Sequence, residues 1–213
     1  MSDKKYTSVF DLKGLELEDF MKKYGDIFEP RYVDLDYYKL YYLGKYDPTL
    51  HIFHYLSQTY EINNVVYPGS FIHLAPSYSF SNVTYIDVYE NIGDFFEQDD
   101  VKKYVDLHKI YDEKTSIIYR NESYMTSQGK FDLMISSNAG SISMDCINLL
   151  KQGGLLLVNN GNNDADNAFE NECYTYLGYF RFSGNQEKVT FIVDGMSKKS
   201  DTYYLFRLDK RWV

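Results

Sequence analysis

The chain has 213 residues and a formal net charge of −9, and 44% of its residues are hydrophobic against 25% charged. This composition is typical of one packed domain and excludes intrinsic disorder as the main state. The negative charge opposes binding to a phosphate backbone, which disfavours nucleic acid as a partner. No stretch approaches the roughly 18 apolar residues of a membrane helix, and residues 1–10 are too polar for a secretory signal. We therefore expect a cytoplasmic protein that does not contact a membrane.

The cysteines and histidines form no metal-binding pattern in the sequence. Cys146 and Cys173 are the two cysteines, and no histidine accompanies them at zinc-ligand spacing. His51 and His54 share a predicted helix at a spacing of three, but no carboxylate lies at a ligand-like offset. We expect two reduced, buried thiols and no metal site.

The first sixty residues predict helices and show no signal for a parallel sheet. Amphipathic or capped helical segments are predicted at residues 15–24, 34–43 and 47–60. The third begins cleanly, because Asp47 can cap the free amides while Pro48 occupies the first helical position. We predict that residues 1–60 form a helical N-terminal extension packed on an α/β domain of residues 61–213.

From residue 61 onward, short apolar runs alternate with amphipathic stretches. The runs predict strands over residues 62–67, 83–88, 115–119, 131–136 and 155–158. Helical patterns lie between them over residues 94–111 and 141–150. Because strand, helix and strand in alternation give right-handed crossovers, we predict a mostly parallel sheet ordered 3-2-1-4-5. Turn residues separate three further strand-like runs, which predict an antiparallel edge over residues 174–182, 188–193 and 202–208.

This order of elements resembles the class I S-adenosylmethionine (SAM) dependent methyltransferases. The most specific stretch is Phe131–Val158, where a strand, a loop, a helix and the run LLKQGGLLLV are similar to the family's fourth strand, helix and fifth strand. The resemblance extends from about Ile62 to Val193. It implies a Rossmann-like, mostly parallel seven-stranded sheet with antiparallel C-terminal edge strands. It also implies SAM as the cofactor and a small molecule or a protein side chain as the methyl acceptor.

The turn after the first strand matches the family's cofactor turn in part. Gly69 falls at the first glycine, whereas Tyr67 holds the usual acidic position and Phe71 the second glycine. A glycine-rich turn lets backbone amides approach the cofactor, so the resemblance implies that Tyr67, Gly69 and Ser70 contact its methionine end. The ring of Phe71 either fills the crevice or turns away from it. We expect it beneath the sheet, with the amides left free.

Further cofactor contacts are implied by the same resemblance. Asp87 ends the second strand, where an acidic residue accepts hydrogen bonds from the ribose hydroxyls; the alternative role is to cap the next helix. Glu122 would face the adenine, and Ser137 and Asn138 follow the fourth strand, where cofactor and substrate meet. The Asn/Asp-Pro-Pro-aromatic signature of enzymes that methylate bases or glutamine is absent there, which disfavours those acceptors.

His73 and Asn138 are the candidate catalytic residues. His73 lies four residues after Gly69, at the mouth of the predicted crevice, where an imidazole can act as a base. Equally, it could hydrogen-bond the backbone of its own loop. Four tyrosines of the second helix offer a choice between roofing a pocket and plain packing, which is the commoner use: Tyr37, Tyr38, Tyr41 and Tyr42.

Two functions of different classes remain open, and either would take a small-molecule ligand as partner. The first is a SAM-dependent methyltransferase. The alternative is a non-catalytic Rossmann-like binding or assembly module that has lost the cofactor, which Phe71 in the turn would favour. The pattern YPGSxxHxxPS at residues 67–77 also resembles a family of prokaryotic proteins to which no activity is attached. The sequence alone leaves open whether the chain is an enzyme.

Overall fold

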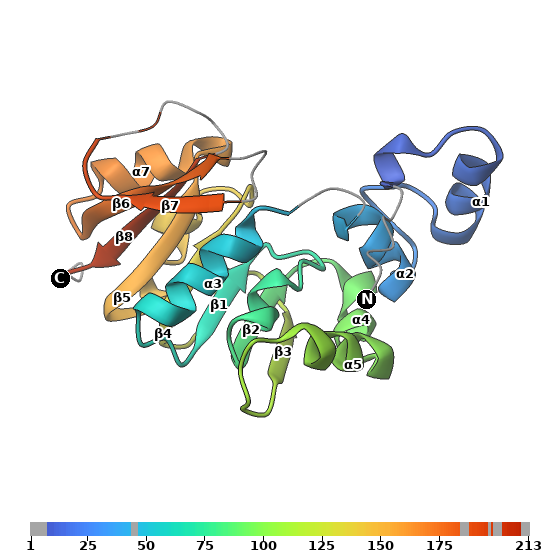
Figure 1. Cartoon of the computed structure of the whole chain (residues 1–213), viewed down its shortest axis with the longest axis horizontal. Helices are drawn as coiled ribbons and strands as arrows, with labels where there is room; N and C mark the ends of the chain where they lie inside the picture. Colours follow the sequence, from blue (N-terminus) through green and yellow to red (C-terminus); the bar gives the residue numbers. More distant parts are fainter. Residues whose placement is uncertain (1–7, 44–46, 184–187, 196, 198–201, 210–213) are drawn as a thin grey trace.

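The computed structural model describes residues 8–43, 47–183, 188–195, 197 and 202–209. Its described strands form one sheet in the order β3-β2-β1-β4-β5-β8-β6-β7 (Figure 1). Their bounds are β1 Val65–Pro68, β2 Asn82–Asp87, β3 Ser116–Asn121, β4 Phe131–Ser136, β5 Leu150–Asn159, β6 Tyr174–Ser183, β7 Lys188–Ile192 and β8 Tyr203–Leu208. The predicted order 3-2-1-4-5 is confirmed.

The sheet is parallel from β3 to β5 and antiparallel beyond β5. The α/β class, the mostly parallel sheet and the antiparallel C-terminal edge are therefore as predicted. Eight strands are described, one more than the seven implied by the resemblance, because all three runs of the tail join the sheet. The last of them, β8, lies between β5 and β6, which leaves the hairpin of β6 and β7 at the edge.

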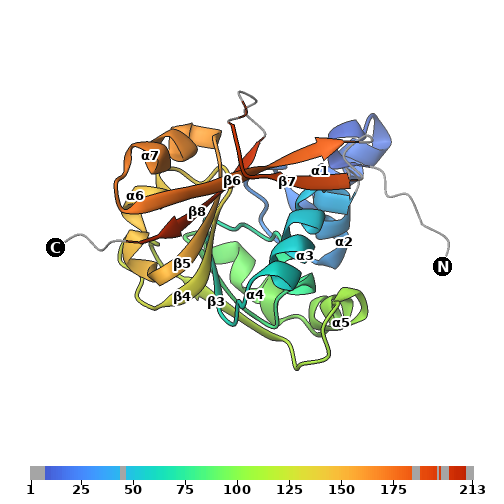
Figure 2. The same cartoon turned by 60° about the vertical axis from the view of Figure 1, so that its left-hand side comes forward.

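Helices cover both faces of the sheet because successive side chains of a strand point to opposite sides. Val65 and Tyr67 of β1 belong to the apolar cluster that contains α3 (Thr49–Thr59), α4 (Gly93–Glu97) and α5 (Asp99–His108). Val66, between them, belongs to a second cluster with α6 (Ile142–Asp145) and α7 (Asp164–Glu170). Figure 2 shows the two helical layers on either side of the sheet.

The N-terminal segment packs into the first of these clusters. Helix α1 (Leu15–Tyr24) ends before Gly25 as predicted, and α2 (Leu35–Tyr38) continues into a π-helical turn at Lys39–Leu43. Apolar side chains from this segment share a cluster with the sheet: Val9, Phe20, Tyr24, Val33, Leu35, Tyr37 and Tyr38. The helical extension therefore has no separate hydrophobic core among the described residues.

Two helices predicted from the sequence are shorter than expected. The pattern over residues 94–111 forms α4 and α5, which are separated at Gln98 by its extended backbone, with φ −62° and ψ 132°. The pattern over residues 141–150 gives α6 and a 3-10 turn, and β5 begins at Leu150 rather than Leu155. The sequence assigned Gly153 to the end of a helix, but it lies within β5 with φ 81°, where the pairing of β5 with β4 shifts register.

Some smaller expectations are also settled in the described residues. Cys146 and Cys173 are buried free thiols, as expected. None of the helices in the described part of the chain has both the length and the apolar character needed to cross a membrane.

Candidate functional site

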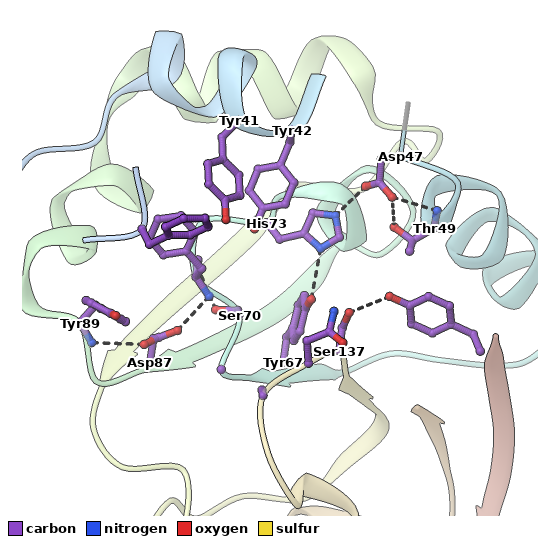
Figure 3. A pocket seen from close by; sticks show the side chains of 16 residues that line it. Tyr41, Tyr42, Asp47, Thr49, Tyr67, Ser70, His73, Asp87, Tyr89 and Ser137 are labelled. Carbon is purple, nitrogen blue, oxygen red and sulfur yellow. Dashed lines mark hydrogen bonds and ion pairs between the residues drawn. The ribbon is translucent and has the colours of Figure 1, made fainter. Parts of the chain in front are cut away.

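A pocket of about 540 Å³ lies at the carboxyl ends of β1, β2 and β4 (Figure 3). This is where the strand order reverses, and ligands of open α/β sheets bind at such switch points. Its floor comes from the loops after these strands, and its roof comes from the N-terminal segment through Tyr41, Tyr42 and Asp47. A volume of this size is in the range of small-molecule sites.

The structure brings together all the sequence-predicted site residues except one. The pocket is lined by Tyr67, Gly69, Ser70, His73, Asp87, Ser137 and Asn138. Glu122 is exposed and lies outside the lining; it accepts a hydrogen bond from the hydroxyl of Ser127 and lies 3.8 Å from Arg120. The proposed contact of Glu122 with an adenine remains a prediction, and it would require the side chain to move.

Gly69 is a glycine because the turn after β1 packs tightly against the loop after β4. Its φ is 63°, and a Cβ built at this position would lie 2.3 Å from the Cβ of Ala139. Both the left-handed backbone and the close approach exclude a larger residue. The glycine thus has a structural reason to be there that does not involve a ligand.

Asp87 ties the turn after β1 to the end of β2. Its Oδ2 accepts a hydrogen bond of 2.8 Å from the amide of Phe71, and its Oδ1 accepts one of 3.2 Å from the amide of Tyr89. The side chain is buried, with 6% of the residue exposed, yet it still lines the pocket. The alternative role as a helix cap is wrong, because the 3-10 turn that follows begins at Glu90 and has no side-chain cap.

Phe71 has a strained backbone and an aromatic environment above the turn. Its φ of 45° lies in the left-handed region that residues with a Cβ seldom occupy. The ring makes edge contacts with Tyr37, Tyr41 and Tyr89, at centroid distances of 6.3, 5.5 and 6.2 Å. The expectation that it lies beneath the sheet with its amide free is therefore wrong. The volume of 540 Å³ remains with this ring in place.

His73 bridges the roof and the floor of the pocket. Its Nε2 lies 2.6 Å from Oδ2 of Asp47, and its Nδ1 lies 3.2 Å from the hydroxyl of Tyr67. The imidazole stacks on the ring of Tyr42 at 4.7 Å, with an interplanar angle of 11°. The loop-backbone alternative is therefore wrong for the side chain, since both ring nitrogens have side-chain partners (Figure 3).

Asp47 holds the start of α3 as well as His73. Its Oδ1 accepts hydrogen bonds from the amide and the hydroxyl of Thr49, at 2.9 and 2.6 Å. Asp47 therefore binds the amide of the first helical residue as predicted, but the N-cap position is held by Pro48, which was expected at the first helical position. Burial opposes ionisation of Asp47, but His73 and the bonds from Thr49 outweigh it and hold the pKa of this carboxyl below its ordinary value.

A second group of polar side chains completes the pocket beside β4. The hydroxyls of Ser137 and Tyr203 lie 2.7 Å apart, and the amide of Asn138 donates to Oδ1 of Asn159 at 3.2 Å. Asn138 has a φ of 57° and is exposed. Its candidate catalytic role remains a prediction.

The sequence did not indicate Asp47 or Tyr203 as pocket residues. It also favoured plain packing for Tyr41 and Tyr42, which form part of the roof. Tyr41 and Tyr42 line the pocket, whereas Tyr37 and Tyr38 are fully buried. Asp47 drew attention as a helix cap, and no local pattern links it to His73. Among the described residues, no group of three or more histidine, cysteine or acidic side chains could hold a metal ion.

Comparisons with known proteins bear on the fold. No protein-family model and no curated protein sequence matches the chain. A putative caffeoyl-CoA O-methyltransferase from Staphylococcus aureus is 13% identical, with a TM-score of 0.50 over 77% of this chain and 84% of the other. The O-methyltransferase TomG from Streptomyces achromogenes, solved with SAM, is 10% identical, with a TM-score of 0.50 over 78% and 82%.

A methyltransferase from Geobacter sulfurreducens is similar to the same extent. It is 14% identical, with a TM-score of 0.50 over 77% of this chain and 81% of the other. At these identities the likeness concerns the fold alone, since one sheet can serve many functions. The chain therefore has the Rossmann-like fold of SAM-dependent methyltransferases.

Proposed function

We propose that the chain is a SAM-dependent methyltransferase that acts on a small molecule. The observation that carries the proposal is the roofed pocket of about 540 Å³ at the switch point, which is lined by two carboxylates, two serines and an asparagine. The roof formed by Tyr41 and Tyr42 favours a small acceptor over a side chain of another protein, which would have to enter with its backbone.

The residues present fit the nucleoside part of SAM. A carboxylate offers about four lone-pair sites, and the amides of Phe71 and Tyr89 use one on each oxygen of Asp87. One site on each oxygen is left for the two hydroxyls of a ribose. Because Asp87 lines the pocket and is already oriented by the backbone, it could accept these bonds without reordering its side chain.

When bound, SAM supplies a methyl group on a sulfonium that a nucleophile can accept. The chain's own contribution is to position and to shield the reactants. Ser70, Ser137 and Asn138 offer polar contacts at the floor, and the aromatic roof would limit the access of water to a bound ligand. The polar groups come from loops anchored on adjacent parallel strands, which keeps them in a fixed arrangement.

A second function is favoured by a specific observation. The amide of Phe71 is bonded to Asp87 and is not free to approach a cofactor, unlike the amides of a glycine-rich turn. A non-catalytic module that binds another small molecule in the same pocket would show the same feature.

Transfer of label from SAM tests the proposal against this alternative. The purified chain would be incubated with methyl-labelled SAM and a pool of small metabolites, and the products separated by mass spectrometry. We expect labelled small molecules that are absent when His73→Ala replaces the parent chain. Tight binding of a pool member without any label transfer would favour the non-catalytic module.

A further inference from the structure

Three side chains form a hydrogen-bonded row from the roof of the pocket to its floor. They are Asp47, which precedes α3, His73 after the turn, and Tyr67 at the end of β1. All three line the pocket (Figure 3). The other rings that face His73 are Tyr42, stacked at 4.7 Å, and Phe53 of α3 at 6.3 Å. Within the part of the chain that the structure describes, Asp47, Tyr67 and Tyr42 are thus the titratable groups in contact with this imidazole.

The donor and the acceptor of each hydrogen bond in the row follow from the carboxylate at its end. The carboxylate of Asp47 stays ionised because its pKa lies below the ordinary value, and it can only accept a hydrogen bond. Nε2 of His73 therefore carries the proton that points at Asp47. In neutral His73, Nδ1 is then the acceptor for the hydroxyl of Tyr67.

With the protons placed in this way, Tyr67 rather than His73 is the group that can exchange a proton with a ligand. Both nitrogens of His73 are engaged, so the imidazole cannot take a proton from a ligand directly. The hydroxyl of Tyr67 lines the pocket close to Ser137. Burial raises the pKa of Tyr67 well above its ordinary value, so Tyr67 stays a phenol and can pass on a proton only while receiving another.

We propose that Asp47, His73 and Tyr67 form a proton relay that deprotonates a phenolic methyl acceptor. The proposal rests on the proposed methyltransferase function and adds the chemical class of the acceptor. Tyr67 would be the catalytic residue that touches the acceptor, and Asp47 a positioning residue that acts through His73.

The pKa of the acceptor's hydroxyl and the shape of the pocket both favour a phenol as the methyl acceptor. Among hydroxyl acceptors, a phenol with an ordinary pKa near about 10 gives up its proton most readily to a relay that ends at an imidazole. A neutral amine already has a free electron pair and needs no base before it is methylated. The walls of the pocket present flat aromatic rings, which favour a planar ligand: Tyr41, Tyr42, Phe71, Tyr89 and Tyr203.

The relay balances protons and electrons over the whole transfer. The acceptor's proton passes to the oxygen of Tyr67 while the proton of Tyr67 passes to Nδ1 of His73. The acceptor oxygen keeps the electron pair of its O–H bond and forms the new O–C bond, and the pair of the broken S–C bond remains on sulfur. The imidazolium so formed is paired with Asp47 and later releases its proton to water.

The test uses 7-hydroxycoumarin, a planar phenol whose absorbance distinguishes phenol from phenolate. The probe would be bound to the parent chain, to Asp47→Asn and to Tyr67→Phe, without SAM, and titrated over pH. We expect the bound probe to ionise about one pH unit lower on the parent chain than on either variant. Tyr78→Phe is the matched control. This variant also loses one buried tyrosine hydroxyl, which is bonded to Tyr38, but Tyr78 does not line the pocket.

A kinetic arm uses SAM and a panel of hydroxylated aromatic compounds. We expect kcat for the best phenol to fall about 100-fold in Asp47→Asn and in Tyr67→Phe, with KM within about threefold of the parent value. Because Asp47→Asn can also loosen the start of α3, Tyr67→Phe tests the relay from its other end. Tyr78→Phe should retain the parent kcat.

Each outcome bears on the relay. The relay is overturned if folded variants ionise the probe like the parent chain, because Asp47 then only fastens α3 to the turn. It is also overturned if SAM binds but no phenol of the panel binds. If the probe ionises as expected and SAM does not bind, the relay stands and the methyltransferase proposal fails.

Discussion

Asp87 is the residue on which the candidate cofactor site depends. Backbone amides of Phe71 and Tyr89 fix its carboxylate, which lines the pocket, and each oxygen keeps a lone pair that these two amides do not use. The same bond helps to hold Phe71 at a φ of 45°, a strained conformation that persists only where its surroundings determine it. One side chain thus holds the turn in place and, under the proposed function, would also accept hydrogen bonds from a ribose.

Asp87→Ala should weaken SAM binding at least tenfold and also destabilise the turn. Hydrogen bonds to a charged group are worth about 1.5–3 kcal/mol each, and the two ribose bonds would be lost. Calorimetric titration measures the affinity, and urea unfolding checks that the variant is folded. Unchanged SAM affinity in a folded variant would show that Asp87 serves the turn alone.

Phe71→Gly should change SAM affinity by less than about tenfold. The ring lines the pocket without filling it, and a glycine would relieve the strained φ while losing the contacts with Tyr37, Tyr41 and Tyr89. Titration of SAM into both proteins measures the effect. A large gain from undetectable binding would mean that the natural ring blocks the cofactor site, and the non-catalytic module would then be the better proposal.

Because of Asp47, the unfolding free energy of the protein should fall at acidic pH. Its folded pKa lies below the ordinary 3.8, so its ionised form adds stability above that value and the contribution is lost as the pH falls through the folded pKa. Asp47→Asn should therefore cost about 1–3 kcal/mol of unfolding free energy at neutral pH. Urea unfolding at several pH values should show this difference shrinking below about pH 4. A difference that is independent of pH would contradict an ionised Asp47 in the folded protein.

At the scale of elements, a buried carboxylate fastens α7 to α6 and β4. Asp164, at the start of α7, accepts hydrogen bonds from the hydroxyl of Ser136 at 2.5 Å and from the amide and hydroxyl of Ser143 at 3.0 and 2.6 Å. The residue is fully buried, and burial raises its pKa above the ordinary value. Since Ser136 directly precedes the pocket residue Ser137, this contact also fixes the loop after β4.

Asp164→Ala should lower the unfolding free energy by at least about 2 kcal/mol, because two buried serine hydroxyls would lose their acceptor. Asp166→Ala is the control on the same helix, since Asp166 is exposed and its bonds are with Asn160. Its cost should stay below about 0.5 kcal/mol. Equal effects of the two changes would contradict the fastening role of Asp164.

The elements that the sequence predicts well are those with a local signal. The apolar runs and the alternation with helices predict the parallel sheet, because strand order follows from right-handed crossovers. The start of β5 at Leu150 was missed because Gly153 and Gly154 read as a helix end, whereas they form an irregularity in the pairing with β4. Helix breaks such as Gln98 depend on packing and have no strong local pattern.

The site was predictable where it follows from strand ends and not where it follows from tertiary contact. Gly69, Asp87 and Ser137 lie directly after strands, so the order of the sheet brings them together. Asp47 pairs with His73 across 26 residues, and Tyr203 meets Ser137 across 66. Only the packing of the N-terminal segment and the position of β8 create these contacts.

At the scale of the whole molecule, the pocket depends on both parts of the chain. The core domain supplies the polar floor after β1, β2 and β4, and the N-terminal segment supplies the aromatic roof and Asp47. The two parts share one hydrophobic cluster, so the roof is fixed relative to the sheet. A pocket closed in this way suits a small acceptor held beside a nucleoside.

Calorimetric titration of SAM into the purified full chain tests the central claim most directly. We expect saturable binding with one site per chain and a dissociation constant in the range of about 1 μM to 1 mM. The demethylated product of SAM should compete for the same site, and Asp87→Ala should weaken both ligands. Absence of SAM binding by the folded parent chain at millimolar concentration would contradict the proposed methyltransferase function.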